Sequence, residues 1–264
     1  MSVFWFDGKC SRDFGVEIER IPNPVFGSRR YEYYEIAGRD GAEVREDGTL
    51  KNYVQPYSVW LTDTSGLDRN IYDVSRKFAK WLLGTSGFCK FEDSYEPEYY
   101  RMAHFAGPLE IETELRTHGS TTLNFTFQPR RYLKAGMKPI KTISYDDDIV
   151  VINPTDRQAN PLIRIQGPSG TCTFSVTTAD GDNRVYIADL SLRPGHAIVI
   201  DAFTYNITYD DGQNASSALT VMANYYALPV LKAGKNTISA AFTSAGTETT
   251  PAYIFSVTPR WWDP

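Results

Sequence analysis

The sequence predicts a mainly β protein with one α-helix in its first half and an antiparallel β-sandwich in its second half. Three observations carry this. Apolar and polar residues alternate over most of the chain, which is the pattern of half-buried strands. Residues 67–83 alone have apolar side chains at helical spacing. Beyond Gly136 the chain holds only short alternating runs separated by turns, as in a sandwich.

Alternation in the first half predicts short strands that form one face of a core. Leu123, Phe125 and Phe127 share a face, and Pro129 is expected to end their strand because proline cannot donate to a ladder. Asp47-Gly48 is expected to form a hairpin-type turn. The strands are expected at residues 3–6, 16–21, 29–36, 52–61 and 121–128.

The helix expected over residues 67–83 has one apolar stripe and one charged face. Thr64, Ser65 and Asp68 are N-cap candidates, and Gly84 is expected to cap the C-terminus. The charged face is expected to point away from a sheet. The stripe consists of Ile71, Val74, Phe78, Trp81 and Leu82.

The second half shows the same alternation in three runs. Residues 171–177 place Cys172, Phe174 and Val176 inward. Two further sets are each expected to share a face, namely Phe203, Tyr205, Ile207 and Tyr209, and Tyr253, Phe255 and Val257. Residues 138–148 mix proline, lysine and three aspartates, so we expect the domain boundary at 137/138.

A turn at residues 36–41 holds two opposite charges, Arg39 and Asp40, between two glycines. Glycine permits the positive φ of a tight turn, so the pair is expected at the tip of an edge hairpin. Charged rim contacts fix the register of a protein interface, which makes Arg39 and Asp40 candidate interface residues. A solvated turn is the alternative.

Glu110, Glu112 and Glu114 are expected on one face of a strand, with Leu109, Ile111 and Leu115 on the other. The acidic face can be simply solvated. Alternatively, it meets a basic residue such as Arg39 or Arg76 of another copy, because ring-forming contacts are heterologous.

Composition excludes several classes of function. The net charge of −5 argues against nucleic-acid binding, which needs a basic surface. Apolar runs are far too short to span a membrane, and the first residues do not resemble a signal peptide. The three cysteines form no CxxC pair and are expected to be reduced thiols of a protein made in a cytosol.

No pattern predicts an enzyme, a cofactor or a metal site. The three histidines lack a second ligand at zinc-site spacing. Residues 180–183 begin like a calcium loop but lack its later glycine and glutamate, so a polar turn is expected. A glycosidase needs two carboxylates flanking a cleft. The candidates Glu92, Asp93, Glu96 and Glu98 are instead expected in an exposed loop around Pro97.

An ordered set of motifs resembles the distal tail proteins (Dit) of long-tailed phages that infect Gram-positive bacteria. The set spans nearly the whole chain, and its most recognisable stretch is residues 36–41. In order, the motifs lie at residues 6–8, 12–16, 36–41, 78–82, 127–130, 151–155, 161–165 and 259–262.

The resemblance implies a β-sandwich-like N-terminal domain (1–137) with one helix, which forms a ring, typically of six copies, and a C-terminal galectin-like β-sandwich (138–264). The ring would join the tail tube protein to the tail-associated tip protein and anchor the receptor-binding proteins. The protein would then be a virion tail component, assembled in the cytoplasm of the bacterial host.

A carbohydrate-binding module that contacts host cell-wall polysaccharide is the alternative. It is suggested by the galectin-like sandwich and by Trp261 and Trp262. Adjacent residues of a strand point to opposite faces, so at most one of these tryptophans can stack on a sugar.

Overall fold

The computed structural model describes residues 2–62, 70–142, 146–222, 227–244 and 253–263. The chain divides into two compact units, Met1–Arg131 and Tyr132–Asp263. The boundary between the units falls within strand β10 (His118–Leu133), which precedes the boundary expected at 137/138. Both units are built mainly from antiparallel strands, and α1 is the one α-helix among the described residues. The mainly β fold predicted from the sequence is confirmed.

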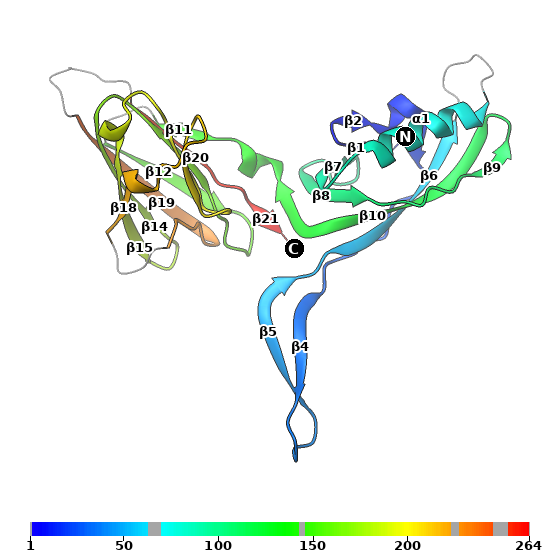
Figure 1. Cartoon of the computed structure of the whole chain (residues 1–264), viewed down its shortest axis with the longest axis horizontal. Coiled ribbons are helices and arrows are strands. Elements are labelled where there is room, and N and C mark those ends of the chain that lie inside the picture. Colours follow the sequence, from blue (N-terminus) through cyan, green and yellow to red (C-terminus); the bar gives the residue numbers. More distant parts are fainter. Residues whose placement is uncertain (1, 63–69, 143–145, 223–226, 245–252, 264) are drawn as a thin grey trace. The chain divides into compact units, whose positions relative to one another are not determined.

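The first unit holds helix α1, the hairpin of β4 and β5, and all strands of a nine-stranded sheet except β21, which belongs to the second unit (Figure 1). The sheet order is β2-β1-β7-β8-β10-β6-β3, and β9 and β21 also pair with β10. The elements up to β10 are β1 Phe4–Phe6, β2 Lys9–Cys10, the 3-10 helix Ser11–Phe14, β3 Val16–Ile18, β4 Arg29–Glu35, β5 Ala42–Leu50, β6 Tyr53–Thr62, α1 Ile71–Gly84, β7 Cys89–Asp93, β8 Tyr99–Phe105, β9 Glu112–Leu115 and β10 His118–Leu133.

Aromatic side chains dominate the core between this sheet and α1. Phe125 lies among the rings of Phe4, Phe6 and Phe91, with centroid separations of 5.7, 5.4 and 5.0 Å. Leu123, Phe125 and Phe127 are all buried, as the alternation predicted. The apolar stripe of α1 also packs inward, with Val74 at its margin.

The ends of α1 differ from expectation. Asn70 is the N-cap, and its side chain accepts a hydrogen bond from the backbone N–H of Tyr72; the predicted caps Thr64, Ser65 and Asp68 lie outside the described residues. Gly84 is the last helical residue and does not cap the helix. Thr85 follows it and donates from Oγ1 to the carbonyl of Trp81 at 2.9 Å.

Two predictions about strand boundaries were wrong. Strand β10 continues through Pro129, because its ladder with β6 ends at the pair Phe127–Tyr53 and the proline lies beyond it. Asp47 and Gly48 lie within β5, where the register with β4 shifts. Asp47 accepts hydrogen bonds from the N–H and hydroxyl of Thr49 there, so this pair forms an irregularity of the strand and not its turn.

The second unit is a sandwich of two five-stranded antiparallel sheets, ordered β11-β20-β13-β16-β17 and β12-β19-β14-β15-β18. Cys172, Phe174 and Val176 face the core, as do Tyr253, Phe255 and Val257. The elements are the 3-10 helix Lys134–Met137, β11 Ile140–Thr142, β12 Asp146–Asn153, β13 Leu162–Gln166, β14 Gly170–Thr177, β15 Asn183–Asp189, the 3-10 helix Leu190–Leu192, β16 Ile198–Asp201, β17 Asn206–Tyr209, the 3-10 helix Ser216–Ala218, β18 Leu219–Val221, β19 Gly234–Ser244, β20 Ile254–Thr258 and β21 Trp262–Asp263.

Phe203 and Tyr205 do not share the inward face of Tyr209. Both are exposed and precede β17. The carboxylate of Asp201 accepts hydrogen bonds from the N–H groups of Phe203 and Thr204, which turns the chain before the strand begins.

Gly136 permits a close backbone approach in the second unit. Its carbonyl accepts a hydrogen bond from the N–H of Arg260 at 2.7 Å. A Cβ on Gly136 would lie 2.6 Å from both the backbone N and the indole Cδ1 of Trp261. Only glycine fits this position without displacing the buried Trp261.

Replacing Gly136 by alanine is expected to lower the free energy of unfolding of the second unit by about 1–3 kcal/mol, the usual cost of overpacking. Urea titration measures it. Gly84→Ala is the matched control, because its Cβ would meet open space at the last residue of α1, so alanine should not destabilise the first unit and should stabilise it by less than about 1 kcal/mol. Equal effects of the two substitutions would contradict the packing argument.

Candidate interaction surface

Strands β4 and β5 form a hairpin that is a two-stranded sheet of its own. Every residue of β4 is exposed, and so is every residue of β5 except the last. Figure 1 shows the hairpin extending away from the nine-stranded sheet of the same unit. A two-stranded hairpin is marginally stable in water unless another surface covers it.

The two faces of the hairpin differ in chemistry. Cross-strand partners share a face, so Tyr33 lies beside Val44, and Tyr31 lies on the same side with its ring 5.1 Å from that of Tyr33. The other face carries more charge, since Glu32 pairs with Arg45 and Tyr34 pairs with Glu43 there. The hairpin therefore exposes an apolar group of Tyr31, Tyr33 and Val44 on one face, bordered by Glu35 and Glu46, and we call this the aromatic face.

Arg39 and Asp40 lie at the tip of this hairpin, where the sequence predicted a turn. Gly38 and Gly41 have φ of +81° and +84°, which explains the glycine on each side of the charged pair. Arg39 forms an exposed ion pair with Glu43, 2.6 Å from Nη1 to Oε1. Arg39 and Asp40 both line a shallow hollow of about 490 Å³.

The three glutamates are not one strand face. Strand β9 begins at Glu112, so Glu110 precedes it, and Leu115 is exposed rather than buried. Glu110 and Glu112 line a second hollow of about 390 Å³ together with Glu19 and Arg20. Glu114 does not line this hollow; it accepts a hydrogen bond from Ser120 at 3.3 Å.

Two of the carboxylates considered for glycoside hydrolysis, Asp93 and Glu96, have structural partners. Asp93 is buried and not in an exposed loop: it pairs with Arg101 at 2.8 Å and accepts the hydroxyl of Tyr57 at 2.9 Å. Glu96 pairs with Arg131 at 2.6 Å. Within the described ranges, no group of three metal-ligating side chains occurs, and no helix is long and apolar enough to cross a membrane.

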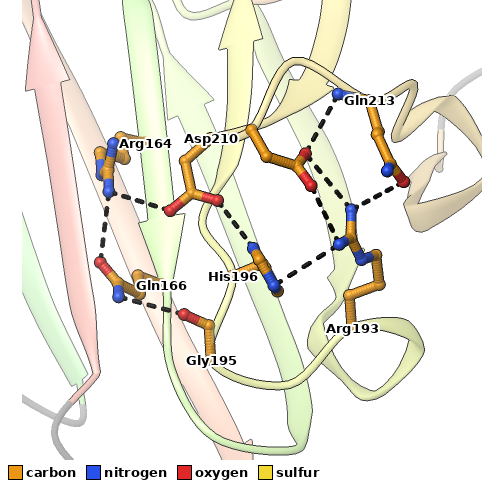
Figure 2. A network of polar contacts seen from close by, with 8 residues as sticks. Arg164, Gln166, Arg193, Gly195, His196, Asp210 and Gln213 are labelled. Carbon is orange, nitrogen blue, oxygen red and sulfur yellow. Dashed lines mark hydrogen bonds and ion pairs between the residues drawn. The ribbon is translucent and has the colours of Figure 1, made fainter.

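A network of polar side chains crosses one sheet of the sandwich (Figure 2). Asp210 joins Arg164 and His196, at 3.5 and 3.0 Å. Arg193 binds Asp211 and Gln213 and contacts Nε2 of His196. The hydrogen bond from His196 lowers the pKa of the Asp210 carboxyl.

This network joins the segment 193–196 to the residues at the end of β17, because Arg193 and His196 bind side chains of residues 210–213. The side-chain amide of Gln166 also donates to the carbonyl of Gly195. The two tryptophans that suggested sugar binding are also engaged. Trp261 is buried in the core, and the indole N–H of Trp262 donates to the carbonyl of Gln158 at 2.9 Å. These contacts do not favour the carbohydrate-binding alternative.

The described fold and hairpin define a class: a two-unit β protein with a sandwich and a projecting hairpin. Among solved structures, the chain resembles the crystal structure of the SPP1 Dit (gp 19.1) protein, described as a paradigm of hub adsorption apparatus in phages that infect Gram-positive bacteria. The two share 16% identity over 100% of both chains, with a TM-score of 0.67. The likeness to Dit proteins that the motifs indicated is thus confirmed at the level of the fold.

Neither a protein-family model nor a curated protein sequence matches the chain. The hairpin's aromatic face and the buried Asp93 are features that the sequence analysis missed. The sequence pattern that could have predicted the aromatic face is the alternation of Tyr31 and Tyr33, together with Val44 on the facing strand.

Proposed function

We propose that this protein is a structural hub of a phage tail, in which copies of the first unit (1–137 in the expected division) form a ring, most simply of six. The observation that carries the proposal is the β4–β5 hairpin, whose aromatic face is uncovered in the single chain. A neighbouring copy would cover it. The fold match to a phage hub adsorption protein supports this role.

The ring would join the tail tube protein to the tail-associated tip protein and anchor the receptor-binding proteins. These partners follow from the role of a distal tail hub. The proposed function is structural, without a catalytic step or a cofactor, and it places the protein in the virion tail after assembly in the host cytoplasm.

Charged side chains would set the register between copies. Arg39 and Asp40 lie at the rim of the hairpin, and Glu110 and Glu112 line an acidic hollow on the same unit. In a heterologous contact, a basic residue such as Arg39 or Arg76 of one copy would approach Glu110, Glu112 or Glu114 of the next. Arg39→Glu should therefore weaken assembly, and more so at low salt.

The adjacent tyrosines 33 and 34 give a matched test of the hairpin contact. Tyr33 is 63% exposed on the aromatic face and Tyr34 is 44% exposed on the charged face. Tyr33→Ser is expected to convert the oligomer to monomers at micromolar concentration, because a buried interface aromatic is commonly a hot spot of about 2 kcal/mol or more. Tyr34→Ser should leave the oligomer intact.

Light scattering after size exclusion reads out both variants, with circular dichroism to verify that each is folded. If Tyr33→Ser assembles as well as Tyr34→Ser, the aromatic face is not the contact between copies.

A further inference from the structure

The outer strands of the sandwich are unequal in length. A sheet has two outer strands, and in the two sheets of the second unit these are β11, β17, β18 and β12. Counted over the described residues, the first three have three, four and three residues, whereas β12 has eight. Proteins usually keep outer strands short, because their unpaired backbone groups are a template for another strand.

The sequence of β12 strengthens this contrast. Ile149, Val150, Val151 and Ile152 form an apolar run in which residues 149 and 151 face the core. Val150 and Ile152 point outward and are 53% and 67% exposed. Within the described residues β12 pairs with β19 alone, so one side of its backbone carries no ladder. The strand thus combines a backbone edge with exposed β-branched side chains.

Three aspartates (146–148) precede the apolar run, and Asn153 and Pro154 follow it. Charges and proline at the ends of an edge limit indiscriminate pairing. They leave a central run of four residues that can accept a strand. The neighbouring outer face carries the short side chains of Thr173, Ser175, Ser239 and Ala241, which line a hollow of about 600 Å³ with Asp148.

We propose that β12 is a docking edge that accepts an extended segment of a partner protein as an added strand. The segment carries β-branched residues at alternate positions, beside Val150 and Ile152, and a lysine or arginine beside Asp148. Main-chain hydrogen bonds supply affinity and the side chains supply specificity in this mode of recognition. The hollow next to Asp148 has room for the stem of a long cationic side chain.

Charge favours a different protein over a second copy as the occupant. If two β12 strands paired antiparallel about Val150, Asp148 would lie opposite Ile152 and Asp146 opposite Pro154. Pro154 has no N–H to donate, and Asp148 would lie opposite the apolar Ile152 rather than a cation. A basic partner strand satisfies both requirements. This inference rests on the sandwich and is independent of the ring proposed above.

The test measures binding of a fluorescent peptide, TVTVTKK, to the full-length protein. In antiparallel pairing its lysines lie beside the aspartates. The matched peptide TVPVTKK has a proline that removes a backbone donor and disfavours the strand. We expect TVTVTKK to bind at least about ten-fold more tightly than TVPVTKK, and to slow amide hydrogen exchange within residues 149–152.

Two protein variants locate the contact. Val150→Lys should weaken binding of TVTVTKK about ten-fold. The substitution removes an apolar cross-strand pair and places a positive charge near the lysines of the peptide. Ile152→Lys is the second choice. Val54→Lys is the control, since Val54 is equally exposed at 52% but lies on β6 of the first unit, where it pairs with Thr126 of β10.

Equal binding of the two peptides, or no protection of residues 149–152, would overturn the proposal. A concentration-dependent association of the protein that is lost in Val150→Lys but kept in Val54→Lys would overturn the choice of occupant and assign the edge to a second copy. The mass of the ring is measured separately, so failure of the ring leaves this test readable.

Discussion

Replacing Asp93 by alanine is expected to lower the free energy of unfolding of the first unit by about 3–5 kcal/mol, because the substitution leaves a buried guanidinium without its counter-ion. Asp93 and Arg101 are both almost fully buried, with 2.8 Å between Oδ2 and Nη2. Arg101 also donates to the hydroxyl of Tyr57 at 2.6 Å and to the side-chain carbonyl of Gln55 at 2.7 Å.

Tyr57 completes the network as a neutral hydroxyl. Burial raises the pKa of Tyr57 well above its ordinary value, although the charge of Arg101 opposes the shift. The hydroxyl therefore keeps its proton and donates it to Asp93 while it accepts from Arg101. Asp93 also accepts the N–H groups of Tyr95 and Glu96, at 2.9 Å each. Its removal thus leaves several buried donors unsatisfied.

Urea denaturation at a fixed protein concentration measures the effect. Asp73→Ala is the control, because it removes an exposed ion pair with Arg76 and should cost less than about 1 kcal/mol. A loss for Asp93→Ala as small as that of Asp73→Ala would show that the buried pair does not stabilise the unit.

Replacing Phe125 by alanine is the second large effect, with an expected loss of about 3–5 kcal/mol for a buried phenylalanine. Phe125 is fully buried on β10 and lies at the centre of the aromatic core. Its ring also lies near those of Tyr57, Phe105 and Phe127. The cavity left by the substitution would be surrounded by rigid rings and strands, which limits relaxation.

Phe26→Ala is the matched control in the same unit, because Phe26 is exposed and contacts Arg131 through its ring face; its expected cost is about 1 kcal/mol or less. The same denaturation experiment compares the two. Similar losses for both variants would contradict the central place of Phe125 in the core.

Local periodicity predicted the strands and the core but not their pairing. The alternation at Leu123, Phe125 and Phe127 gave the buried face correctly, and helical spacing gave the inward stripe of α1. Pro129 was misjudged because the effect of a proline depends on where the neighbouring ladder ends. Asp47-Gly48 was misjudged because a strand irregularity and a turn favour the same residues.

The candidate surface was predicted only at its tip. Glycines on each side of Arg39 and Asp40 indicated the turn, but alternation at Tyr31 and Tyr33 is the same for a half-buried strand and for a projecting hairpin. The carboxylate of Asp93 was expected in an exposed loop because the local sequence does not show its partner. Arg101 comes next to Asp93 only when strands β7 and β8 pair. Tertiary contacts supply this information and sequence periodicity does not.

We propose that the protein assembles into a ring through the β4–β5 hairpin. Light scattering after size exclusion of the full-length protein, at several concentrations, tests it most directly. We predict one discrete species with a mass near six times the chain mass of 29.8 kDa, which is lost in Tyr33→Ser and kept in Tyr34→Ser. A monomer at every concentration would contradict the claim.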